Sequence, residues 1–224
     1  MRFVLTDLKR VFTEPAFYIS IFLNLLLLFG AYVYLTLGEN TDRIYETAQS
    51  LALPFAAPVL AAMPYSVMIM QENETRYGTL MKIKLRGKDY QLRRFLVSGF
   101  SGAMALFIPQ LILFIVCTAA EGVGEYPAFT LILPLTFGFS YAVISYGLTF
   151  VNRQRYVPLV MPQVIYLLMI YSFPVLGLSR FYPPLDISPA IYGGEITADR
   201  FVIPLMLTVI AFLLTLLGKA GDRK

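Results

Sequence analysis

The chain has 224 residues, of which 58% are hydrophobic and only 14% are charged, and its mean hydropathy is +0.68. A soluble globular domain usually carries about 25% charged residues, so this composition argues against a water-soluble all-helical protein. The formal net charge of +4 does not require a nucleic acid partner, because the basic residues follow a membrane pattern described below.

Residues 1–15 predict a basic amphipathic helix. Apolar residues recur there at i, i+3, i+4 and i+7, opposite a polar face that includes Arg2, Lys9 and Arg10. A helix of this kind next to a membrane span is expected to lie in the inner membrane interface. Pro15 is tolerated in the first turn of the helix that follows.

Long apolar segments make up most of the remaining chain. About 20 apolar residues in a helix cross the hydrocarbon core of a bilayer. Six windows contain no Asp, Glu, Lys or Arg: 16–37, 51–71, 96–118, 128–151, 157–178 and 201–218. We therefore expect an all-α integral membrane protein, with six transmembrane helices in a domain over 16–218 and a cytoplasmic tail at 219–224.

The distribution of basic residues between loops predicts the orientation. With the N-terminus in the cytoplasm, 15 of the 18 Lys and Arg residues fall on the inner side. Only Arg43, Arg180 and Arg200 fall on the outer side. Cytoplasmic loops carry such an excess, so both termini are expected in the cytoplasm. We also expect the protein to be a multi-pass protein of a prokaryotic plasma membrane.

The spans are rich in proline, and two of them share a pattern. The second and fifth spans both open with P-x-x-x-P, at Pro54/Pro58 and Pro158/Pro162. Matching proline-interrupted spans in a three-plus-three repeat point to a translocation path, which Gln163 would also line. The alternative is that the prolines are ordinary kinks and that Gln163 makes a hydrogen bond between helices.

The residue types exclude several kinds of chemistry. The chain has no histidine, which removes His-based acid–base catalysis and most zinc sites. It has no G-x-x-x-x-G-K-[ST] loop, so it does not hold nucleotide phosphates in the P-loop manner. Because the six windows lack Asp, Glu, Lys and Arg, we expect the chain to be no enzyme, to bind no cofactor or metal, and to receive energy for uphill transport from outside the membrane.

The inner segment 72–95 is where such energy would arrive. Its residues 79–87 are compatible with a short helix or with a strand, and we favour the helix because an isolated hairpin is marginal in water. The sequence over 72–80 is Glu-Asn-Glu-Thr-Arg-Tyr-Gly-Thr-Leu. It resembles the segment after the second span in permease subunits of the type-2 ABC export family, where acidic residues and Gly-Thr-Leu precede a short helix that contacts the ATPase. The chain differs from that pattern at Met81-Lys82 and Arg86-Gly87.

The resemblance implies that this segment couples the chain to an ATPase, through Glu72, Glu74, Arg76, Gly78, Thr79, Leu80 and Ile83. In physical terms, Gly78 permits a tight turn and Thr79 can cap the next helix. Leu80 and Ile83 would form a small apolar projection that could fit a cleft on the ATPase subunit. The alternative is an ordinary basic loop that faces phospholipid.

The function that the resemblance implies is the permease of an ATP-driven exporter. A second permease chain, identical or related, and separate ATPase subunits that bind ATP and Mg²⁺ would complete the complex. The uncharged spans favour an amphipathic or lipid-like substrate, such as a drug, antimicrobial peptide or lipid. The alternatives are a channel or carrier without an ATPase, and a membrane immunity or assembly protein that transports nothing.

Overall fold

The computed structural model describes residues 2–38, 44–74, 87–121, 131–151, 154, 156–186 and 198–221. These residues form helices and turns, with no strand among them. The α-helices are α1 (Arg2–Thr13), α2 (Pro15–Leu37), α3 (Ile44–Glu74), α5 (Gly87–Glu121), α6 (Ile132–Leu148), α7 (Val157–Val175) and α8 (Val202–Gly221). Short 3₁₀ turns follow α7 and precede α8: η2 (Ser179–Phe181), η3 (Pro183–Asp186) and η4 (Ala198–Phe201).

The expectation of an all-helical membrane protein is confirmed at this level. Four helices contain segments long and apolar enough to cross a membrane, at Pro15–Leu37, Leu53–Glu72, Tyr90–Ala120 and Val157–Val175. Two further apolar helices, Ile132–Leu148 and Val202–Leu217, are shorter.

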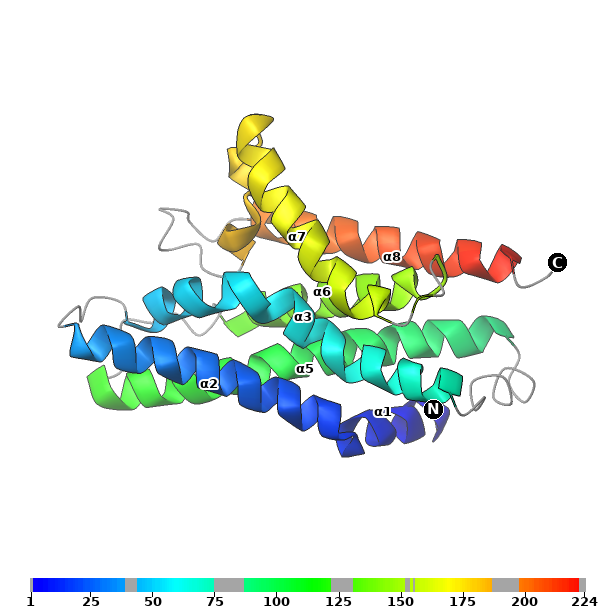
Figure 1. Cartoon of the computed structure of the whole chain (residues 1–224), viewed down its shortest axis with the longest axis horizontal. Coiled ribbons are helices and arrows are strands. Elements are labelled where there is room, and N and C mark those ends of the chain that lie inside the picture. The colour runs from blue at the N-terminus through cyan, green and yellow to red at the C-terminus, as the bar shows by residue number, and fades with distance from the viewer. Residues whose placement is uncertain are drawn as a thin grey trace.

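The helices differ strongly in how much of their surface is covered. The apolar segment of α3 is 67% buried, whereas that of α7 is 17% buried. Figure 1 shows α2, α3, α5 and α6 running alongside one another, with α8 along one side and α7 tilted away from the rest. An apolar helix that is mostly exposed is stable in lipid and would be unfavourable in water, which agrees with a membrane protein.

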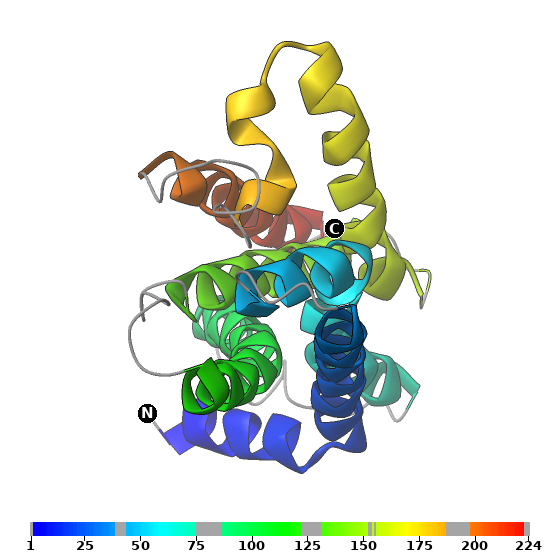
Figure 2. The ribbon, with the colours of Figure 1, turned by 90° about the vertical axis from the view of Figure 1, so that its left-hand side faces the viewer.

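The N-terminal helix ends at the predicted break. Glu14 has an extended backbone (φ −72°, ψ 133°), and Pro15 occupies the first turn of α2. Figure 2 shows α1 lying crosswise to α2 and α5, which are viewed nearly end-on. Val11 of α1 is fully buried, so one face of this helix packs into the bundle.

Glycines bring α5 and α6 into close contact. A Cβ atom at Gly138 would lie 2.6 Å from the carbonyl oxygen of Gly102, and one at Gly102 would lie 2.5 Å from the carbonyl oxygen of Ala61. Small residues allow this approach between helix backbones, as is common in membrane bundles. The centre of the bundle is therefore held at the crossing of α3, α5 and α6.

Prolines inside the helices free backbone carbonyls that neighbouring helices use. A proline has no N–H, so the carbonyl four residues earlier loses its partner in the helix. Ser20 donates to the carbonyl of Leu60, which Pro64 frees, at 2.7 Å. Asn24 donates to that of Ala105, freed by Pro109, at 3.5 Å, and Ser145 donates to that of Pro158, freed by Pro162, at 2.5 Å.

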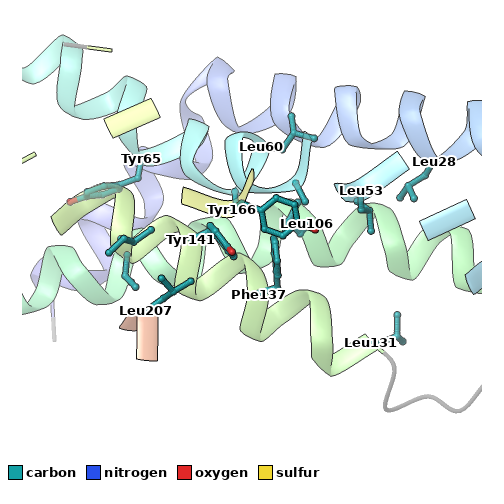
Figure 3. Close-up of a cluster of buried hydrophobic side chains, with 14 of the residues drawn as sticks. Leu28, Leu53, Leu60, Tyr65, Leu106, Leu131, Phe137, Tyr141, Tyr166 and Leu207 are labelled. Carbon is teal, nitrogen blue, oxygen red and sulfur yellow. The ribbon is translucent and has the colours of Figure 1, made fainter. Parts of the chain in front are cut away.

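Aromatic side chains fill the space between α6 and α7. The ring of Tyr141 lies 4.3 Å from that of Phe137 and 5.7 Å from that of Tyr166, measured between centroids. Figure 3 shows Phe137, Tyr141 and Tyr166 gathered in one cluster. All three side chains are at most 1% exposed, so this cluster anchors the otherwise exposed α7.

Candidate functional site: a buried ion cluster

Four charged side chains meet where α1, α3 and α5 come together. Glu72 of α3 accepts hydrogen bonds from two arginines: from Nη1 of Arg10 at 2.9 Å, and from Nη2 of Arg94. Asp7 of α1 lies 3.6 Å from Nη1 of Arg10 and 3.9 Å from Nε of Arg94. We call Asp7, Arg10, Glu72 and Arg94 the ion cluster.

The ion cluster is buried and its formal charges cancel. Asp7, Glu72 and Arg94 are 2%, 3% and 7% exposed, while the Arg10 side chain is 33% exposed. A buried charge is tolerated only when it is paired and hydrogen-bonded. The guanidinium suits this role because its several donors can reach more than one carboxylate oxygen.

Tyrosines surround the Arg94 guanidinium. Its Cζ atom lies 4.9 Å from the ring centroid of Tyr90 and 5.7 Å from that of Tyr65, which is within reach of a cation–π interaction. The Tyr65 hydroxyl donates a long hydrogen bond to Asp7, at 3.5 Å. Tyr146 of α6 packs edge-on against Tyr65, so the surroundings of the cluster extend to a fourth helix.

Burial changes the proton affinity of Asp7. Removal from water raises the pKa of this carboxyl above its ordinary value of 3.8, because the charged form loses hydration. The nearby arginines, Arg94 first, oppose this shift, and the negative charge of Glu72 adds to it. Asp7 therefore holds its proton more tightly in the folded protein than in the unfolded chain.

The cluster lies beside the predicted coupling segment. Glu72 precedes the last residue of α3, Glu74, by two positions, and Arg94 lies in the N-terminal turns of α5, which begins at Gly87. The cluster thus joins the two helices between which residues 75–86 run. It also ties both helices to α1.

The predicted coupling residues divide into two groups. Glu72 is in the cluster, and Glu74 is in the last turn of α3. Five others lie outside the described residues: Arg76, Gly78, Thr79, Leu80 and Ile83. The predicted short helix after Gly78 also falls on residues outside the described part of the chain, up to residue 86.

The predicted interfacial residues have different surroundings. Lys9 is exposed on α1, and Arg2 is in the first turn of that helix. Arg10 instead turns inward to Glu72. The basic residues of α1 therefore differ in their surroundings: Arg10 contacts the bundle, whereas Lys9 stays on the exposed side of the helix.

The predicted path residues lie on two helices that pack together. Pro54 and Pro58 of α3 and Pro158 and Pro162 of α7 are buried, and Gln163 is partly buried. Among them the Pro158 carbonyl accepts a hydrogen bond from Ser145, at 2.5 Å. A further bond joins Ser145 to Ser66 of α3 at 2.6 Å, so α3, α6 and α7 meet at this point.

Asp7 and Arg94 were not among the residues predicted to be functional. Glu72 and Arg94 lie just outside the charge-free windows 51–71 and 96–118, near the ends of the apolar helical segments Leu53–Glu72 and Tyr90–Ala120. One signal was present: Asp7 is the only acidic residue in α1. A lone acidic group in a basic amphipathic helix is expected to have a specific partner.

No family model matches the chain, and no curated protein or solved structure matches it either.

Proposed function

We propose that this chain is the membrane-spanning permease subunit of an ATP-driven exporter of the type-2 ABC kind. In this proposal α2, α3, α5, α6, α7 and α8 form six spans, with both termini in the cytoplasm. A second permease chain and separate ATPase subunits complete the complex. ATP and Mg²⁺ are bound by the ATPase, and the substrate is amphipathic or lipid-like.

The observation that carries the proposal is the position of the ion cluster. Glu72 in the last turn of α3 and Arg94 in the second turn of α5 join the two helices that flank residues 75–86, and Asp7 and Arg10 connect both to α1. A force applied by a partner to the intervening segment would reach three helices through charged contacts that are costly to break. The resemblance of residues 72–80 to the coupling segment of these permeases supports the same role.

The mechanism follows from this connection. Closure of the ATPase subunits on ATP displaces the segment, and the cluster makes α1, α3 and α5 respond as one unit. α7 contacts α6 through Tyr166 and through the bond from Ser145 to the Pro158 carbonyl, and the rest of its surface is largely exposed, so in this proposal it moves together with α6. The opening alternates between the two sides of the membrane as these groups of helices shift.

Co-purification of the native complex in detergent tests the proposal. We expect an ATPase subunit to copurify with the chain, and transport in vesicles to require ATP. Glu74→Ala and Gly78→Val should uncouple ATP hydrolysis from transport while leaving membrane insertion unchanged. Glu14→Ala, which removes an acidic residue from the α1–α2 junction, is the matched control and should leave coupling intact.

Two results would contradict the proposal. The first is full transport activity of the purified chain in vesicles that contain no nucleotide-hydrolysing subunit, which would favour a channel or passive carrier. The second is unchanged coupling in both Glu74→Ala and Gly78→Val, which would remove the role assigned to the segment.

A further inference from the structure

Helix α1 is held to the bundle by a small buried face. Among its residues 5–13, only Asp7 and Val11 are buried, and they lie one turn apart on the same side of the helix. Phe12 adds an edge-on contact with the ring of Phe100 in α5, at 6.4 Å between centroids. One of the two buried side chains on which the docking of α1 depends is therefore an acid.

The two carboxylates of the ion cluster are not held equally. Glu72 accepts hydrogen bonds from both arginines, from Arg10 at 2.9 Å and from Arg94. Asp7 lies 3.6 Å from Arg10 and 3.9 Å from Arg94, and both distances are too long for a hydrogen bond. The Tyr65 hydroxyl contacts Asp7 at 3.5 Å, which is longer than an ordinary hydrogen bond. Glu72 therefore compensates the arginines more closely than Asp7 does.

A neutral Asp7 fits the same surroundings. A protonated carboxyl donates one hydrogen bond, and the oxygen of the Tyr65 hydroxyl can accept it. Arg94, which is 7% exposed, keeps its bond to Glu72. The Arg10 side chain is 33% exposed, so water can compensate its charge. Loss of the negative charge of Asp7 therefore leaves no buried guanidinium unpaired.

The charged and titratable groups around Asp7 come from four helices. They are Arg10 of α1, Tyr65 and Glu72 of α3, Tyr90 and Arg94 of α5, and Tyr146 of α6. Arginine stays charged and tyrosine stays neutral between about pH 3 and pH 8, so the two carboxyls are the members that can change charge in this range. Burial opposes the charged form of Asp7 more strongly than the arginines favour it, and its pKa is raised above 3.8.

Protonation of Asp7 and docking of α1 are therefore linked. When α1 leaves the bundle, Asp7 regains water and its pKa returns toward 3.8. The docked helix holds the proton more tightly, so docking takes up a proton. We propose that Asp7 binds a proton as α1 docks on α3 and α5, so that acid on this side of the membrane favours the docked position of α1. This holds whether or not the chain is a permease.

An infrared titration of the full-length chain tests the proton site. The chain is placed in phosphatidylcholine vesicles, whose headgroups stay zwitterionic, and the carbonyl band of protonated carboxyl groups is followed as the pH changes. Subtraction of the Asp7→Asn spectra isolates the band of Asp7, and we expect its midpoint above pH 3.8. Glu14→Gln, which changes an acidic residue outside the ion cluster, is the control and should leave the Asp7 band in place.

The absence of tryptophan from the sequence allows docking itself to be measured. Phe12→Trp places one fluorescent reporter on the docked side of α1, and Leu5→Trp, at a position that is 64% exposed, is the matched control. Both are made together with Val11→Ala, which weakens docking so that docked and free α1 are both populated. Acrylamide in the water quenches the Phe12→Trp reporter more strongly when α1 is free than when it is docked.

The pH dependence of this quenching has a predicted sign. As the pH rises from about 3.8, the ratio of free to docked α1 reported by Phe12→Trp should increase, by at most about tenfold per pH unit, because each undocking releases one proton. Quenching of Leu5→Trp should stay constant. Asp7→Asn, which resembles the protonated form, should remove the pH dependence of the Phe12→Trp reporter and keep α1 docked.

Three results would overturn the proposal. The first is an Asp7 band with its midpoint at or below pH 3.8. The second is quenching of Phe12→Trp that is constant with pH or falls as the pH rises, and the third is a pH dependence that persists in Asp7→Asn. The infrared titration uses no substitution on the apolar part of the docked face, so it decides the proton site even if Phe12→Trp prevents docking.

Discussion

The hydroxyl of Ser20 in α2 donates a hydrogen bond to the carbonyl oxygen of Leu60 in α3, at 2.7 Å, and that carbonyl is available because Pro64 has no N–H to offer it. The proline therefore turns a bond within one helix into a bond between two. Ser20 is fully buried, so no water can replace its hydroxyl. Proline inside a membrane helix is tolerated when a neighbouring group donates a hydrogen bond to the carbonyl that the proline frees.

Ser20→Ala should destabilise the protein by about 1–2 kcal/mol, because it leaves the Leu60 carbonyl buried without a donor. Pro64→Ala restores an N–H within α3, so the same serine substitution should cost less than about 0.5 kcal/mol in that background. The measurement is the unfolding free energy of the four proteins of the cycle in detergent, followed by circular dichroism. Equal costs of Ser20→Ala in both backgrounds would show that the bond contributes nothing.

The ion cluster predicts a larger effect. Glu72→Gln leaves Arg94 buried without its closest carboxylate, and removal of one partner from a buried ion pair costs about 3–5 kcal/mol. Lys9→Gln, on the exposed face of α1, is the control and should change the unfolding free energy by less than about 0.5 kcal/mol. A Glu72→Gln protein as stable as the wild type would mean that the cluster is hydrated and holds α1, α3 and α5 together only weakly.

The apolar parts of the helices and the break before Pro15 could be predicted from the sequence, but the charged ends of α3 and α5 could not. Charge-free windows locate the lipid-compatible part of a helix, and each of the six windows overlaps one α-helix of the structure. The structure extends α3 to Ile44–Glu74 and begins α5 at Gly87, because helices tolerate charged residues at their ends when these have partners or reach the surface. The charge-free windows stop at the first charged residue, so they predict α3 and α5 to be shorter than they are.

The ion cluster could not be predicted because its members lie far apart in the chain. Asp7 belongs to the predicted interfacial helix, and Glu72 and Arg94 stand at opposite ends of the charged segment 72–95. The positions of the prolines in the sequence show which backbone carbonyls lose their partner within the helix. They do not show that Ser20, Asn24 and Ser145 are the donors to these carbonyls, because which helices lie side by side depends on packing that one sequence does not reveal.

The raised pKa of Asp7 makes a signed prediction about pH. A carboxyl that holds its proton more tightly when folded stabilises the protein most below its unfolded pKa, and this contribution is lost as the pH rises through the folded value. The unfolding free energy of the wild type minus that of Asp7→Asn should therefore fall as the pH rises from about 3.8, by at most about 1.4 kcal/mol per pH unit. A difference that grows with pH would mean that Arg94 and Arg10 outweigh burial at this site.

Two glycines test the packing of α5 against α6. In Gly138→Ala the new methyl group would lie 2.6 Å from the carbonyl oxygen of Gly102 and 2.9 Å from the Cα atom of Ala103. Both are backbone atoms, so the helices must separate, and we expect a loss of about 1–3 kcal/mol of unfolding free energy. Gly30→Ala is the matched control, because no atom lies within 4 Å of its new methyl group. Alanine is the better helix former, so Gly30→Ala should stabilise α2 by about 0.5–1 kcal/mol. If both substitutions raise the thermal unfolding midpoint in detergent, α5 and α6 are not in backbone contact, and the crossing that holds the centre of the bundle is looser than the structure describes.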